Sequence, residues 1–264
     1  MHDVDAKAID PLCPVCQGVL REGALFCSNC GYCGTASPVI PSRVELQSST
    51  TNFDSHWGEI KQVGWLFGLL LFSSLILGMT ARSIPSPWPE AIASGIDAVI
   101  VLMFASLRYR DTLSLLVLPK LSVRSALELL GVVLTFIAIM GAYFALIQRA
   151  GVPVFHIATK FKQFDWPIWS MFFLVSAMPA IFEELAFRGV IQSALERVLG
   201  EREAWIIQAA LFSVLHLLPM MFLSHFAMGL CLGYMRRQSK SLYPGMILHA
   251  GWNALVLYQE LYSS

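Results

Sequence analysis

The feature that most limits what this chain can fold into is a series of apolar segments after residue 62. Seven segments contain at most one charged residue each: 63–79, 91–107, 125–147, 167–182, 204–218, 220–235 and 242–258. A bilayer span needs about 20 apolar residues. The fifth and sixth segments are short of this, and the fourth is expected to continue as a helix to residue 199. The sequence predicts an all-α fold, a polytopic bundle of about seven transmembrane helices.

Composition supports this fold class. Charged residues make up 14% of the chain and hydrophobic residues 56%, whereas a soluble domain carries about 25% charged residues. Lysine and arginine together number 18, as do aspartate and glutamate, so the formal net charge is zero. The chain has no excess of positive charge, so its composition does not indicate a nucleic-acid partner. The partner expected from composition is membrane lipid.

The positions of the basic residues predict the orientation of the bundle. With seven spans and a cytoplasmic N-terminus, 14 of the 18 lysines and arginines fall on the cytoplasmic side and 4 on the outer side. Cytoplasmic loops of membrane proteins are enriched in these residues. The sequence therefore predicts a multi-pass integral protein of the cell or inner membrane, with its N-terminus in the cytoplasm and its C-terminus outside.

The segment before the apolar region contains two Cys-x-x-Cys pairs, Cys13 with Cys16 and Cys27 with Cys30. Each pair places two thiolates on one tight turn, and two such turns close a tetrahedral zinc site. We predict a structural zinc ion in a ribbon over residues 1–36, whose folding depends on the metal. Cys33 could replace Cys30 as the fourth ligand. Disulfides are the alternative, and a reducing cytoplasm disfavours them.

The domain boundaries follow from these patterns. Residues 37–61 include a stretch rich in serine, threonine and proline and are predicted to be a linker to the membrane domain at 62–264. The ribbon resembles zinc-ribbon modules often found at the termini of bacterial and archaeal proteins. It suggests recruitment of a protein partner or substrate at the cytoplasmic face.

Several polar residues interrupt the apolar segments: Glu183, Glu184 and Arg188 in the fourth, His216 in the fifth, and His249 and Asn253 in the seventh. A charge at the centre of a bilayer costs about 2.5–3.5 kcal/mol on insertion scales, so such residues indicate function. Glu184 and Arg188 are four residues apart and can pair on one helix face. Glu183 points about 100° away and is left to face another partner.

Other polar or small residues in these segments are interpreted as structural. Asp97 is expected to pair across the bundle, and Glu128 lies close enough to a span end to reach water. His225 is interpreted as a packing residue. Gly229 and Gly233 form a GxxxG pair, which predicts close approach of two helices.

The candidate residues suit peptide-bond hydrolysis, which requires an activated water and a stabilised oxyanion. A glutamate in apolar surroundings is a suitable general base, and a histidine beside it can share the water. A second histidine and an asparagine can donate hydrogen bonds to the developing oxyanion. Glu183, His216, His249 and Asn253 fit these roles.

Three motifs, in this order, carry a family resemblance: Glu183-Glu184-x-x-x-Arg188, Phe212-x-x-x-His216 and His249-x-x-x-Asn253. They resemble the motifs of the CaaX protease and bacteriocin-processing (CPBP, or Abi) family over about residues 170–258. The resemblance implies a membrane-embedded endopeptidase that acts on a membrane-associated protein or peptide. It implies that Glu183 and His216 activate water, that His249 and Asn253 hold the oxyanion, and that Glu184 and Arg188 organise the site.

Alternatives stay open for both mechanism and function. Two histidines and a glutamate could bind a catalytic zinc with one open position, or the site could be a metal-free glutamate protease. Asn253 is a poor zinc ligand and a good oxyanion donor, which favours the metal-free mechanism. Two functional alternatives are a non-catalytic immunity or scaffold membrane protein, and a proton-coupled transporter in which buried carboxylates and imidazoles relay protons.

Overall fold

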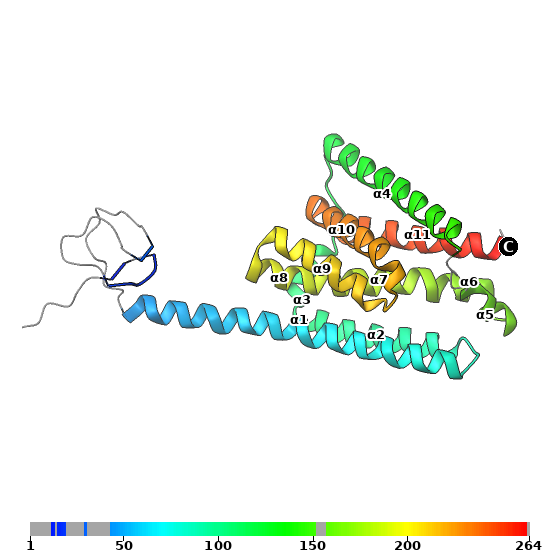
Figure 1. Ribbon diagram of the computed structural model, residues 1–264, viewed down its shortest axis with the longest axis horizontal. Coiled ribbons are helices and arrows are strands. Elements are labelled where there is room, and N and C mark those ends of the chain that lie inside the picture. Colours follow the sequence, from blue (N-terminus) through cyan, green and yellow to red (C-terminus); the bar gives the residue numbers. More distant parts are fainter. Residues whose placement is uncertain (1–11, 14, 20–28, 31–42, 152–156, 263–264) are drawn as a thin grey trace, which may run out of the picture. The chain divides into compact units, whose positions relative to one another are not determined.

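The computed structural model describes residues 12–13, 15–19, 29–30, 43–151 and 157–262 (Figure 1). The internal contacts divide the chain into two units, Met1–Asp54 and Ser55–Ser264. The described residues contain helices and one isolated β-bridge, between Leu12 and Val19, with no extended strand. The predicted all-α fold class is therefore confirmed.

The helical elements follow one another with short connections. They are α1 (Arg43–Ser83), α2 (Trp88–Leu107), α3 (Tyr109–Leu115), α4 (Val123–Arg149), α5 (Ile157–Gln163), α6 (Ile168–Phe172), η1 (Phe173–Ala177), α7 (Met178–Glu183), η2 (Glu184–Ile191), α8 (Gln192–Leu199), α9 (Glu201–Leu215), η3 (Pro219–Met221), α10 (Phe222–Ser239) and α11 (Tyr243–Tyr262). The elements from α6 to α8 form one continuous helical stretch, in which η1 and η2 are π-helical. Each of the seven predicted apolar segments coincides with a helical stretch, and the part of the predicted linker from residue 43 onward is helical too.

Among the residues that the structure describes, four helices are long and apolar enough to cross a bilayer: His56–Ala81, Trp88–Leu107, Val123–Arg149 and Ile168–Leu199. They identify a membrane protein. Helix α9 has 15 residues, fewer than the roughly 20 that a full span needs. It is joined to α10 through the short 3-10 turn η3, so these two helices form a tight hairpin.

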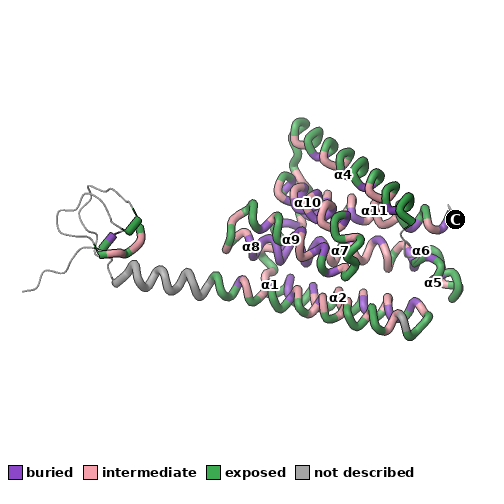
Figure 2. Tube along the Cα trace, in the orientation of Figure 1, coloured by how far each residue is buried: buried purple, intermediate pink, exposed green. Residues whose placement is uncertain are grey.

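The stretch from η2 into α8 is the centre of the bundle. Residues 184–195 are all buried (Figure 2), as expected for a helix surrounded on every side. Helix α2 packs against α7 and η2, and α9 packs against α8 and η2. By contrast, the buried residues of α4 form a single stripe: Leu129, Phe136, Met140 and Ile147. The polar candidate residues of the fourth segment thus lie at the centre of the fold.

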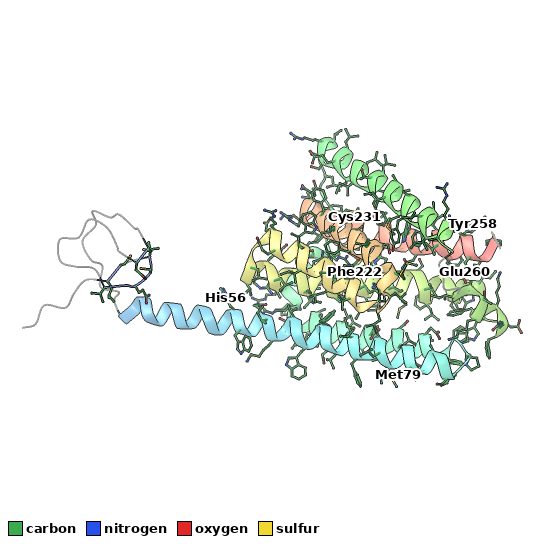
Figure 3. All side chains as sticks on the ribbon, in the orientation of Figure 1. His56, Met79, Phe222, Cys231, Tyr258 and Glu260 are labelled. Atoms are coloured by element: carbon green, nitrogen blue, oxygen red, sulfur yellow. The ribbon has the colours of Figure 1, made fainter. Side chains whose placement is uncertain are left out.

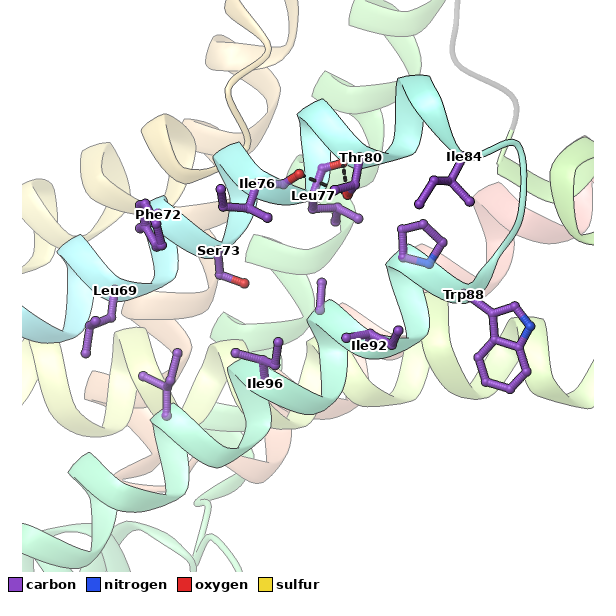
Figure 4. Close-up of a pocket in the computed structure, with 13 residues that line it drawn as sticks. Leu69, Phe72, Ser73, Ile76, Leu77, Thr80, Ile84, Trp88, Ile92 and Ile96 are labelled. Atoms are coloured by element: carbon purple, nitrogen blue, oxygen red, sulfur yellow. Dashed lines mark hydrogen bonds between the residues drawn. The ribbon is translucent and has the colours of Figure 1, made fainter.

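A groove of about 350 Å³ lies between α1 and α2 (Figure 4). Its lining residues are apolar except Ser73 and Thr80. The Thr80 hydroxyl donates to the carbonyls of Ile76 and Leu77 at 2.9 and 3.1 Å. The groove lies within two of the candidate spans, so hydrocarbon chains are the surroundings that suit it.

Ion pairs and hydrogen bonds connect the helices at both ends of the bundle. Near one end, Glu59 of α1 accepts hydrogen bonds from Arg108 and, at 2.8 Å, from Arg197 of α8. Near the other, Lys160 of α5 donates to Glu90 of α2 at 2.7 Å, and Glu260 of α11 accepts from the backbone nitrogen of Ala158 at 2.6 Å. Helix α5 therefore joins α2 to the end of α11, near the labelled Glu260 in Figure 3.

Two glycines allow α9 and α10 to approach closely, as the GxxxG pair predicted. A Cβ atom on Gly229 would lie 2.7 Å from the Cα atom of Ala209. A Cβ atom on Gly233 would lie 2.8 Å from Cδ1 of Trp205 and 2.5 Å from Nε2 of Gln208. Because the neighbour of Gly229 is backbone, it cannot move aside without shifting the whole helix.

We predict that Gly229→Ala destabilises the bundle. Overpacking of this kind costs about 1–3 kcal/mol, so the thermal unfolding midpoint in detergent should fall clearly. Gly141→Ala in α4 is the control, because its Cβ atom would meet nothing within 4 Å, and alanine is the better helix former by about 0.5–1 kcal/mol. Equal midpoints for the two variants would contradict the close packing of α9 on α10.

Candidate active site

The carboxylate of Glu184 is the centre of the candidate site. Its side chain is 1% exposed, and its Oε1 atom accepts hydrogen bonds from Nη1 of Arg188 at 2.8 Å and from Nδ1 of His249 at 3.1 Å. The i,i+4 pair predicted from sequence is therefore present, and it also holds a histidine from α11. Gly245 makes room for this carboxylate, since a Cβ atom there would lie 2.8 Å from its Oε2 atom.

Arg188 connects the Glu184–Arg188 ion pair to the neighbouring helices. Its side chain is fully buried, and its guanidinium lies over the ring of Phe212, 4.4 Å from the ring centroid. Its Nη2 atom donates to the Gly229 carbonyl at 3.5 Å, and Nε2 of Gln208 donates to the same carbonyl at 2.9 Å. One buried cation thus contacts η2, α9 and α10.

Phe212 is the aromatic centre of the site. Its ring centroid lies 4.9 Å from that of His216, 5.9 Å from that of His249 and 5.2 Å from that of Phe187. Its side chain is fully buried. The sequence motif contained Phe212 as the first residue of Phe-x-x-x-His, but it was not among the predicted site residues. The structure shows that it packs between residues from three helices.

Glu183 is the last residue of α7, directly before the π-helical stretch η2. Its side chain is 26% exposed, and its Oε2 atom lies 3.9 Å from Nε2 of His249. This oxygen has no hydrogen-bond partner among the described residues. Asp97 of α2 was expected to pair across the bundle, and its Oδ1 atom has no hydrogen-bond partner among the described residues. Of the two adjacent glutamates, Glu184 is thus the one that pairs with Arg188, and Glu183 is the more exposed.

Three histidine rings are anchored through the same ring atom. Nδ1 of His216 pairs with the Phe212 carbonyl at 2.8 Å, and Nδ1 of His225 pairs with the Met221 carbonyl at 2.9 Å. Nδ1 of His249 pairs with the Glu184 carboxylate. Because carbonyl and carboxylate oxygens only accept, each Nδ1 carries hydrogen. In the neutral rings, every Nε2 atom therefore holds a lone pair.

His216 occupies a strained corner of the α9–α10 hairpin. It is the C-cap of α9, and the next residue, Leu217, has a φ of 53°, a left-handed conformation that is uncommon for a bulky residue and frequent at functional sites. The turn is held by Ser213, whose hydroxyl donates to the Phe222 carbonyl at 2.6 Å, and by the Tyr143 hydroxyl of α4, which donates to the Met220 carbonyl. Phe222 is labelled in Figure 3.

The structure therefore brings most of the predicted residues together. Glu183, Glu184, Arg188 and His249 form one cluster, and Phe212 connects His216 to it. Asn253 lies one turn after His249 on α11 and is half-buried, and its side chain makes no hydrogen bond to another described residue. His225, interpreted from the sequence as a packing residue, lies with its ring 3.9 Å from that of His216, a contact that the sequence did not predict. Its place in an apolar segment, just after a hairpin that follows His216, was the available signal.

The N-terminal cysteines form a separate candidate metal centre. The Sγ atoms of Cys13, Cys16 and Cys30 lie within 4.8 Å of one another, and those of Cys13 and Cys30 are 3.6 Å apart. Tetrahedral Zn–S bonds of about 2.3 Å place two sulfurs about 3.8 Å apart, so this geometry fits zinc. The predicted ligand Cys27 and the alternative ligand Cys33 lie outside the described residues.

The geometry of the candidate active site fits a zinc ion less well than that of the N-terminal cysteines. Among the residues that the structure describes, three ligand atoms of His, Cys, Asp or Glu come within 4.8 Å of one another at the N-terminal cysteines. Glu183, His216 and His249 do not form such a group. As described, these three side chains would have to move together before they could share one ion.

Comparison with known proteins gives a family for this region. Residues 165–255 match the family described as Type II CAAX prenyl endopeptidase Rce1-like. Comparison with curated proteins and with solved structures gave no match. The matched residues include the three motifs and all six of the predicted site residues in the bundle. Residues 165–255 of this membrane protein are thus similar to the Rce1-like family, which supports the resemblance to the CPBP family that the motifs carry.

Proposed function

We propose that this protein is an intramembrane endopeptidase that cleaves a peptide bond in a membrane-associated protein or peptide. The observation that carries the proposal is Glu183, a half-buried carboxylate whose Oε2 atom has no hydrogen-bond partner among the described residues. It faces the Nε2 atom of His249 across 3.9 Å and lies in a helix long and apolar enough to cross the membrane. A carboxylate in that position costs free energy to bury, so its presence indicates a function.

The proposed reaction begins with a water molecule between Glu183 and His216. Glu183 removes one proton as the water oxygen bonds to the carbonyl carbon of the substrate, and Nε2 of His216 accepts the other O–H of that water as a hydrogen bond. The C–N bond then breaks, and the proton held by Glu183 passes to the leaving amine nitrogen. The products are a carboxyl and an amino terminus.

His249 and Asn253 are proposed to hold the oxyanion. To donate through Nε2 while Nδ1 donates to Glu184, the His249 ring carries both protons, and the Glu184 carboxylate balances its charge. The side-chain amide of Asn253, one turn later on α11, supplies the second donor. Arg188 keeps Glu184 in place through its own hydrogen bond to Oε1. No step in this scheme needs a metal ion.

We further propose a structural zinc at Cys13, Cys16, Cys27 and Cys30, in a ribbon over residues 1–36 that a linker at 37–61 joins to the protease domain at 62–264. The ribbon is proposed to recruit a partner or substrate. The distribution of lysine and arginine supports seven spans with a cytoplasmic N-terminus and an outer C-terminus.

We predict that Glu183→Gln abolishes cleavage. General base catalysis contributes about 10²–10⁴-fold to a rate, so the loss should reach at least the lower end of that range. The measurement compares protein termini in membranes from cells that carry wild-type protein or the variant at matched expression. Termini that vanish with Glu183→Gln identify the substrates.

Glu128→Gln serves as the control for this experiment. Glu128 lies on α4, is paired with Arg124 at 2.9 Å and is partly exposed, so its loss should leave the termini unchanged. If wild-type protein and Glu183→Gln give the same termini and the same phenotype, the protease proposal fails and a scaffold or immunity function replaces it.

We predict that Gly245→Ala lowers activity, because its Cβ atom would lie 2.8 Å from Oε2 of Glu184 and would push the carboxylate away from His249. The expected effect is a fall of about tenfold or more in the cleavage rate, in line with the cost of a small displacement at a catalytic site. Gly251→Ala on the same helix is the control, since nothing lies within 4 Å of its Cβ position. Equal activity in both variants would exclude a role for the Glu184–His249 contact.

We predict one zinc ion per chain in purified wild-type protein and none in Cys13→Ser, measured by elemental analysis. Cys231→Ser, at a buried cysteine in α10, should retain the metal. Two ions in wild-type protein and one in Cys13→Ser would instead place a metal in the membrane domain and overturn the metal-free mechanism. The cysteine variant thus separates the two sites, which a chelator cannot do.

A further inference from the structure

The contact between His225 and His216 is not explained by the roles proposed so far. The two ring centroids lie 3.9 Å apart with an interplanar angle of 37°, so the rings touch face to face at a tilt. Phe212 completes the group, 4.9 Å from His216 and 6.3 Å from His225. The ring of His216 is therefore bounded by Phe212 near one edge and by His225 along its face.

His225 is held more firmly than a residue that only fills space. Its Nδ1 atom pairs with the Met221 carbonyl at 2.9 Å and approaches the Ser224 hydroxyl at 3.4 Å. Met221 belongs to η3, the turn whose Met220 carbonyl accepts from Tyr143 of α4. The ring of His225 thus has a fixed position relative to the hairpin and to α4.

His216, by contrast, needs support from outside its own helix. It follows the last residue of α9 and precedes Leu217 in its left-handed conformation, so no regular helical turn packs on its C-terminal side. The one hydrogen bond that its ring makes among the described residues, to the Phe212 carbonyl, fixes Nδ1 but leaves the ring able to tilt about that bond. The face contact with His225 removes this freedom.

We propose that His225 is a positioning residue of the hydrolytic site: its anchored ring sets the tilt of His216, so that the Nε2 lone pair of His216 points at the attacking water. This proposal rests on the proposed peptidase function. It assigns a role to a histidine of α10 that lies outside the three sequence motifs.

The test compares three substitutions at the same position. His225→Ala removes the ring and its anchor, and kcat should fall about tenfold with KM changed less than twofold, because substrate binding does not use this residue. His225→Phe restores a ring against His216 without the anchor, and it should recover part of the lost kcat. His225→Asn keeps a donor for the Met221 carbonyl but no ring, and it should behave like His225→Ala.

Phe226→Ala is the matched control. Phe226 is the next residue of α10, and its ring stacks on Phe222 with centroids 6.0 Å apart, whereas the ring contacts of His216 among the described residues are with Phe212 and His225. Removing it should leave kcat unchanged. An unchanged kcat in His225→Ala, or an equal loss in Phe226→Ala, overturns the proposal.

A second measurement does not depend on finding a substrate. Nitrogen NMR of ¹⁵N-histidine-labelled protein reports the tautomer of each ring, and His216 should show a proton on Nδ1 in wild-type protein and in His225→Phe. In His225→Ala the proton should stay on Nδ1, but the Nε2 signal of His216 should shift and broaden, because the ring is then free to tilt about its bond to the Phe212 carbonyl. Unchanged His216 signals overturn the positioning role, whereas wild-type protein that cleaves nothing while these signals do shift overturns only the peptidase function.

Discussion

The buried pair of Glu184 and Arg188 is the interaction on which the rest of this structure depends. Two full charges lie at the centre of an apolar bundle, where each ion costs several kcal/mol to desolvate and an unpaired one would cost more. The pair is tolerated because other groups complete its hydrogen bonds. His249 donates to the same carboxylate oxygen, and the face of Phe212 lies against the guanidinium. The ion pair is thus also the support for the ring that faces Glu183.

Small residues let the helices close around this pair. Gly245 leaves space for the Glu184 carboxylate, and Gly229 brings its own carbonyl within reach of Arg188 and Gln208. Larger side chains at these two positions would separate α10 or α11 from the central helix. Close packing of these helices is therefore also what lets the buried polar groups form their hydrogen bonds. This is expected where no water can replace a missing hydrogen bond.

The site also depends on irregular backbone. The π-helical stretch η2 begins at Glu184, directly after Glu183, and π-helical turns are frequent at functional sites. Across the bundle, α9 stops at Leu215 and the chain turns through Leu217 with a positive φ. These departures from regular geometry place a free carboxylate on one helix and two imidazoles on a hairpin near it. Serine and tyrosine hydroxyls hold the hairpin from both sides.

A good part of this protein could be predicted from the sequence. The apolar segments predicted the helices, because a bilayer span requires an uninterrupted apolar stretch. The costly polar residues within them predicted Glu183, Glu184, Arg188, His216 and His249 as a site, and the i,i+4 spacing predicted the Glu184–Arg188 pair. The cysteine spacing predicted a metal centre, and three of its sulfurs are close together in the structure. These features are local, so spacing along the chain is enough to define them.

Other features were decided only by tertiary structure. Nothing in the spacing showed that Glu184 holds His249, that Phe212 contacts residues from several helices, or that His225 lies against His216. The packing of α9 is another example, since this helix is short and its place depends on the hairpin it forms with α10. A single histidine in an apolar segment gives the same sequence pattern whether it only packs or also positions another ring. The sequence alone determined which residues are too polar for their surroundings, and the packing of helices distant in sequence decided which of them meet, because contact depends on the third dimension.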